Sequence, residues 1–260
     1  MQIRRNLAVG IFVTVTAALF VGMLFVAPIS QPDSYHHFSD TRSFFGIPNA
    51  LNVLSNAGFL VVGVAGLWFL LARSNESFIS ASERLSYLVL FFGILLTTFG
   101  SAYYHWSPSN ETLVWDRLPM TFGFMGLFAG CLSERIGLRA GRLLLWPMVV
   151  VGILSVTYWQ QTGDLRPYIL VQFYSLIAIA MLIALFGPRY TRGGDIYIAI
   201  AFYALAKVLE SYDKLIHATL RIVSGHTLKH IAAAAASFVL LRMLYKRKAI
   251  QQTLAVAASD

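Results

Sequence analysis

Long apolar segments follow one another along almost the whole chain. Each is close to the roughly 20 residues that an α-helix needs to cross a bilayer. Only 12% of the 260 residues are charged, whereas soluble domains carry about 25%. The eight segments cover approximately residues 7–28, 50–72, 85–104, 117–133, 143–160, 168–186, 195–212 and 227–245. The sequence therefore predicts an all-α fold, a polytopic membrane helix bundle.

Two of these segments fit a membrane span least well. The fourth, 117–133, is short, and the seventh, 195–212, carries Lys207 and Glu210. Lys207 at i−3 or Lys214 at i+4 can pair with Glu210, so we expect a structural ion pair there. The single cysteine, Cys131, excludes an intrachain disulfide framework and a cysteine-based metal cluster.

The chain divides into three predicted parts. Residues 1–30 are expected to form an N-terminal transmembrane helix, 31–248 the membrane domain and 249–260 a cytoplasmic tail. Arg4 and Arg5 followed by an apolar run also describe a signal peptide. We favour a retained helix, because the run is long and no clear A-x-A site follows it.

Basic residues define an orientation in the membrane. The net charge of +8 does not indicate a nucleic-acid partner, because the basic residues lie in short connections between apolar segments. One set of alternating connections holds twelve Lys and Arg residues: Arg4, Arg5, Arg73, Arg84, Arg135, Arg139, Arg142, Arg189, Arg192, Lys246, Arg247 and Lys248. The other holds five: Arg42, Arg117, Arg166, Lys214 and Arg221. The positive-inside rule then predicts that both termini are cytoplasmic.

Five polar residues fall at segment ends on the predicted non-cytoplasmic side. They are Ser101 and His105 in GSAYYHW, Asp116 in VWDRLPM, and His226 and His230 in SGHTLKH. The pairs Ser101/His105 and His226/His230 are spaced i,i+4, which places both side chains on one helix face. Titratable groups beside long apolar runs mark functional sites by default. The shared depth therefore predicts one site.

These residue types suit a catalytic zinc. Such an ion is commonly held by three protein ligands with water in the fourth position, here His105, His226 and His230. The metal lowers the pKa of that water towards 7. Asp116 can take the water's proton, and Ser101 can donate a hydrogen bond to the water or a developing oxyanion.

Simpler interpretations of the same residues stay open. An H-x-x-x-H pair near a membrane surface is more often interfacial than metal-binding. Asp116 beside Trp115 can simply cap the fourth helix, because aspartate is favoured at helix N-termini.

The order and spacing of these motifs resemble the alkaline ceramidases. The likeness rests on S-x-x-x-H, on an aspartate eleven residues later within D-x-L-P-M, and on the late H-x-x-x-H. NVLSN at 52–56 is similar to the family's N-x-x-S-N at the start of its first core helix. The resemblance runs from about residue 35 to 245. It implies a seven-helix core preceded by one extra N-terminal transmembrane helix.

The resemblance also implies a reaction. His105, His226 and His230 match the zinc ligands, while Ser101 and Asp116 match the two residues that assist the metal water. The family hydrolyses the amide of ceramide, a membrane lipid, to a fatty acid and a sphingoid base.

The family's calcium site does not carry over cleanly. The segment YHHFSDTRSFFGIPN holds Asp40 and Asn49 but few carboxylates, which puts calcium dependence in doubt. The same superfamily offers two alternatives. One is a zinc-containing receptor or sensor of the haemolysin III/adiponectin-receptor type, and the other is a Per1-like lipid-remodelling esterase.

Overall fold

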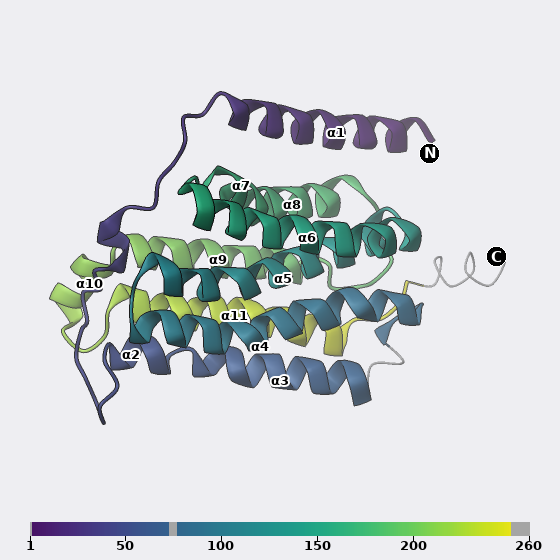
Figure 1. The fold of residues 1–260 in the computed structure, drawn as a ribbon. Helices are drawn as coiled ribbons and strands as arrows, with labels where there is room; N and C mark the ends of the chain where they lie inside the picture. Colours follow the sequence, from purple (N-terminus) through teal and green to yellow (C-terminus); the bar gives the residue numbers. More distant parts are fainter. Residues whose placement is uncertain (1, 73–76, 251–260) are drawn as a thin grey trace.

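A computed structural model describes residues 2–72 and 77–250, and these residues form helices without a β-strand (Figure 1). The all-α prediction is confirmed for them. The helices are α1 (Gln2–Leu24), α2 (Ala50–Leu54), α3 (Ala57–Ala72), α4 (Arg84–Trp106), α5 (Asn110–Arg135), α6 (Leu138–Thr162), α7 (Arg166–Ile169), α8 (Ser175–Leu185), α9 (Asp195–Ser211), α10 (Asp213–Leu220) and α11 (Gly225–Lys246). Short 3-10 turns cover Asp33–His36 and Ala81–Glu83, and one π-helical turn covers Leu170–Tyr174.

Within the described ranges, six helical stretches are long and apolar enough to cross a membrane. They are Ile3–Leu24, Ala50–Ala72, Ala81–Trp106, Leu138–Thr162, Arg166–Leu185 and Gly225–Lys246. This composition is that of a multi-pass membrane protein. The helices α5 and α9 are not among these six. They correspond to the predicted segments 117–133 and 195–212, the two that fitted a membrane span least well. The seven-helix core therefore stays a prediction.

The start of α5 differs from the expected boundary at residue 117. The helix begins at Asn110, and Ser109 caps it: its Oγ accepts from Thr112 N at 3.2 Å, and Thr112 Oγ1 accepts from Ser109 N at 3.0 Å. This capping box satisfies N–H groups that the first turn leaves free, so a polar segment becomes helical. Asp116 consequently lies inside α5 and is not its cap. Arg117 is a buried helix residue, not a loop residue as the charge count assumed.

The helix α1 lies along one side of the bundle, where it contacts α8 (Figure 1). Most of its large apolar side chains are exposed, including Leu7, Val13 and Leu24. Ala8 is buried in these contacts, and the hydroxyl of Tyr174 lies 3.0 Å from Thr16 Oγ1. This exposed apolar surface is what a helix facing lipid would present.

Glycine brings α4 and α5 close together beside the predicted site. A Cβ atom on Gly100 would lie 1.9 Å from the carbonyl oxygen of Trp115. Because only glycine allows this approach, residues 101 and 116 are held on facing turns. Further along the bundle, α3, α4, α8 and α11 share a buried core that includes Leu70, Phe91, Leu182 and Leu244.

Two parts of the sequence predictions fall on residues outside the described ranges. They are Arg73, which was counted for the orientation, and residues 251–260 of the predicted cytoplasmic tail. Before that tail, Ile250 N donates to Arg189 O at 3.0 Å, and Ala249 forms an isolated bridge with Tyr190.

Candidate metal centre

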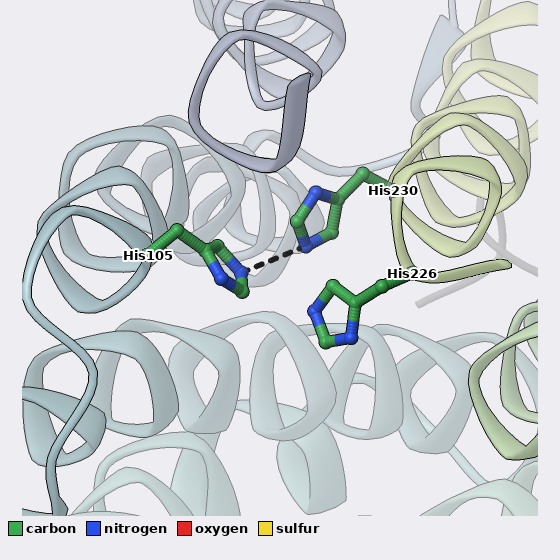
Figure 2. A group of neighbouring side chains, drawn as sticks. All are labelled: His105, His226 and His230. Carbon is green, nitrogen blue, oxygen red and sulfur yellow. Dashed lines mark hydrogen bonds between the residues drawn. The ribbon is translucent and has the colours of Figure 1, made fainter. Parts of the chain in front are cut away.

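Three buried histidines meet near one end of the helix bundle. His105 comes from the last turn of α4, while His226 and His230 come from the first turns of α11 (Figure 2). Their potential ligand atoms all lie within 4.8 Å of one another, and His105 Nε2 is 3.1 Å from His230 Nε2. The predicted grouping of these residues is confirmed, and this triad can hold a metal ion.

One nitrogen separation in the triad fits a small tetrahedral cation. Zinc–nitrogen bonds of roughly 2.0–2.1 Å imply nitrogen separations of about 3.4 Å in a tetrahedral site. The His105–His230 separation of 3.1 Å is close to that value. His105 Nδ1 is buried and has no hydrogen-bond partner among the described residues. Such an atom is costly to bury, and a metal bound at Nε2 would not contact it.

The first turn of α11 is fixed by its own N-cap and by polar contacts that reach two other segments. Ser224 caps the helix by accepting from Thr227 N at 3.1 Å. The backbone N–H of His226 donates to Asp213 Oδ1 at 2.7 Å. Asn52, the first residue of NVLSN, accepts from Thr227 Oγ1 at 2.8 Å. These bonds set the position from which both histidines of α11 project.

A serine that the sequence did not single out for the site orients one histidine. Ser55, also in NVLSN, lies at the break between α2 and α3, and its Oγ is 2.7 Å from His230 Nδ1. Histidines that bind metals almost always use their second nitrogen in such a hydrogen bond. The motif was visible in the sequence, but only the fold shows which histidine it reaches.

Ser101 and Asp116, the two predicted catalytic residues, lie beside this triad. Both are buried. Ser101 is one helical turn before His105 on α4, and both Ser101 and Asp116 line a cavity together with His230. The structure thus brings all five predicted residues into one region, while the roles of Ser101 and Asp116 stay predictions.

The cavity beside the triad has a volume of about 360 Å³. Its inner walls are apolar and include Phe59, Ile94, Leu127 and Leu240. Ser101, Asp116, Arg117, Lys207, Lys229 and His230 also line it. A mostly apolar cavity with a few convergent polar groups is the usual form of a small-molecule site.

A half-buried ion cluster lies next to the histidines. Glu210 on α9 pairs with Lys207, as the sequence predicted, and with Lys229 on α11 at 2.5 Å. The alternative partner Lys214 was wrong, because it follows the end of α9 and Lys229 takes the second carboxylate oxygen. Lys229 Nζ also lies 3.4 Å from His226 Nε2. The cluster therefore places a positive charge at the edge of the triad.

In the loop before α2, the two residues considered for a calcium site, Asp40 and Asn49, make contacts with other protein groups. Arg42 donates to Asp40 Oδ1 through Nε at 2.8 Å and to Oδ2 through Nη2 at 2.7 Å. These hydrogen bonds hold the pKa of Asp40 below its ordinary value. Asn49 donates from its side-chain amide to the carbonyl oxygen of His105 at 2.8 Å. Both residues thus serve protein contacts, and Asn49 ties the loop to the triad.

Comparison of the chain with protein-family models, with curated proteins and with solved structures finds no match.

Proposed function

We propose that this chain is a zinc-dependent intramembrane lipid amide hydrolase that cleaves a ceramide-like substrate to a fatty acid and a sphingoid base. The observation that carries the proposal is the contact between a buried three-histidine cluster and an apolar cavity lined by Ser101 and Asp116. A structural metal site has less need of a carboxylate and a hydroxyl on an adjoining cavity.

Zinc is the metal that the donor set supports best. Three imidazoles without cysteine or carboxylate ligands are a known catalytic zinc set, with the fourth position left for water or substrate. When bound, zinc acts as a Lewis acid and makes water a nucleophile near neutral pH.

The chain's own residues supply the proton transfer. Asp116 takes a proton from the attacking water as the water oxygen bonds to the amide carbon. The same carboxyl group then gives this proton to the amide nitrogen, which leaves as the amine when the C–N bond breaks. Ser101 lines the same cavity as Asp116, and its hydroxyl would donate a hydrogen bond to the attacking water or to the developing oxyanion. The apolar walls hold the acyl chain and exclude bulk water.

The arrangement of the helices supports the predicted orientation, in which both termini are cytoplasmic and the site faces the other side. Figure 1 places the first turn of α1 and the last turn of α11 at one end of the bundle. The end of α4 and the start of α11, which carry the triad, lie at the opposite end. Residues 1–30 would then be a retained membrane helix, and residues 31–248 the catalytic domain.

Metal analysis and a ceramide-hydrolysis assay on the same purified sample test the proposal. Stoichiometric zinc with turnover supports it. Zinc without amide turnover favours the receptor type, and turnover of an ester lipid alone favours the Per1-like type. A protein with neither metal nor turnover contradicts the proposed function.

A further inference from the structure

We propose that Arg117 is an anion-binding residue of the cavity, so that the cavity binds an amphiphile with an acyl chain and one anionic group, a carboxylate or a phosphate, as a substrate or as the fatty-acid product. The inference deepens the proposed function and rests on it for the lipid character of the ligand. It is carried by contacts of Arg117 that have no part in the metal centre.

Arg117 is a buried cation with unused hydrogen-bonding capacity. It lies on α5 with 7% of its surface exposed, and it lines the cavity. One terminal nitrogen, Nη2, donates to the side-chain oxygen of Gln31. The other, Nη1, is buried and has no hydrogen-bond partner among the described residues. A buried charged donor left unpaired is costly, so a ligand that accepts from Nη1 would be stabilised.

Three aromatic rings surround the guanidinium group of Arg117. Its guanidinium carbon lies 4.2 Å from the ring centre of Trp159, 4.9 Å from that of Tyr168 and 5.8 Å from that of Tyr35. Within the described ranges, no carboxylate oxygen lies within the 4.0 Å of an ion pair. Rings stabilise the cation through their faces, but they leave the in-plane N–H donors free for an oxyanion.

Arg42, Arg166 and Arg247, in contrast, have carboxylate partners. Each of these arginines pairs with an aspartate or glutamate in the folded chain. Arg117 therefore differs from them in lacking a counter-ion, although it is among the more deeply buried arginines.

The balance of charge around the polar part of the cavity also favours an anion. Its cations are Arg117, Lys207 and Lys229, and the carboxylates that face them belong to Asp116 and Glu210. Both lysines pair with Glu210. One positive charge is left in excess. In a low-dielectric cavity an uncompensated charge attracts a counter-ion strongly.

The remainder of the cavity selects for an apolar chain. Leu90, Ile94, Leu127 and Leu240 line it, and burial of methylene groups against such walls is favourable. A planar carboxylate matches the guanidinium fork well, because two parallel N–H donors can bind its two oxygens. The two features together describe an acyl lipid whose polar end carries a negative charge.

A binding experiment separates this proposal from a purely structural Arg117. The full-length protein in detergent, at equal metal content, is titrated with a C16 fatty acid, a C16 alkyl phosphate and the neutral C16 alcohol. We expect the wild type to bind at least one of the two anions roughly tenfold tighter than the alcohol, as a charge-assisted hydrogen bond provides. In Arg117→Gln this preference should disappear while binding of the alcohol is unchanged. Arg117→Lys should keep part of it.

Arg42→Gln is the matched control, because it removes a cation whose partner is Asp40, and it should keep the full preference. The proposal is overturned if the wild type shows no preference, or if Arg117→Gln keeps it or weakens acid and alcohol equally. Binding is measured without turnover, so a failure here is distinct from a failure of the hydrolase proposal. Faster hydrolysis of an N-acylglycine than of a neutral amide would assign the anion to the substrate. Equal or absent hydrolysis, with the binding preference intact, would assign it to the fatty-acid product.

Discussion

Ser55 and His230 are 175 residues apart in the chain, yet the serine hydroxyl lies 2.7 Å from Nδ1 of the imidazole. This contact leaves Nε2 of His230 directed at His105, whose own Nε2 is 3.1 Å away. A hydrogen bond at one ring nitrogen fixes both the orientation of the ring and the nitrogen that can bind a metal. Ser55 therefore supports the metal centre without contacting the ion.

Replacement of this hydroxyl should weaken metal binding. We expect Ser55→Ala to lower metal affinity by about 10–100-fold, the range found when such supporting groups are removed. Competition with a chelator of known affinity measures the change. Ser211→Ala is a suitable control, because Ser211 is exposed and its hydroxyl, among the described residues, donates only to the carbonyl oxygen of Lys207 in its own helix. Equal affinity in wild type and Ser55→Ala would contradict the role of Ser55.

Removal of any one triad histidine should lower metal occupancy. In His105→Ala, His226→Ala and His230→Ala, one of three nitrogen ligands is lost, and the remaining pair cannot complete a stable site. Elemental analysis of the purified proteins checks this. His37→Ala, which changes an exposed histidine, should keep the wild-type metal content. Full occupancy in all three triad variants would end the metal assignment.

The helical segments and the polar residues of the site could be predicted from the sequence, because both depend on local patterns. Long apolar runs indicate the helices, and i,i+4 spacing puts His226 and His230 on one face. The start of α5 could not be predicted from hydropathy, since its first turn is polar and is stabilised by Ser109 and Thr112. A helix boundary set by capping lies outside an apolar run.

Contacts between distant segments were the other part that the sequence did not show. Glu210 has possible partners at several local spacings, but its second partner, Lys229, comes from another helix. The aromatic contacts of Arg117 could not be predicted for the same reason. Tyr35, Trp159 and Tyr168 come from three separate segments. Both arrangements depend on helix packing, which a single sequence does not specify by spacing.

The ion pair of Asp40 and Arg42 should give the protein an acid-dependent stability. Because the folded-state pKa of Asp40 is lowered by hydrogen bonds from Arg42, its contribution is complete above the unfolded-state pKa of about 4. The contribution is lost as the pH falls below that value through the folded-state pKa. Asp40→Asn should therefore have a lower Tm than wild type at pH 7, and the difference should shrink below about pH 4. A constant difference across this range would contradict the assignment.

The orientation predicted from the basic residues can be tested with reporters. We expect reporter fusions after Asp260 to be cytoplasmic. Cysteine accessibility at an exposed loop position such as Ser107, near the triad-bearing end of α4, should be limited to the other face. An external C-terminus would refute the orientation and the side assigned to the site.

Asp116 distinguishes an enzyme from a receptor. Since Ser109 caps α5, a capping role no longer accounts for this buried carboxylate. Asp116→Asn keeps its size and most of its hydrogen bonding but removes its basicity. We expect metal content to stay at the wild-type level, while hydrolysis per bound metal falls by roughly 10²–10⁴-fold, as for a lost general base. Ser101→Ala should also keep the metal and show a smaller loss, because its hydroxyl would donate a hydrogen bond to the attacking water or to the developing oxyanion and would not take the proton. Ceramide turnover at the wild-type rate in Asp116→Asn would show that the proposed proton transfer is wrong. Loss of metal together with activity would instead make Asp116 part of the metal centre, and the three-histidine set would have to be extended.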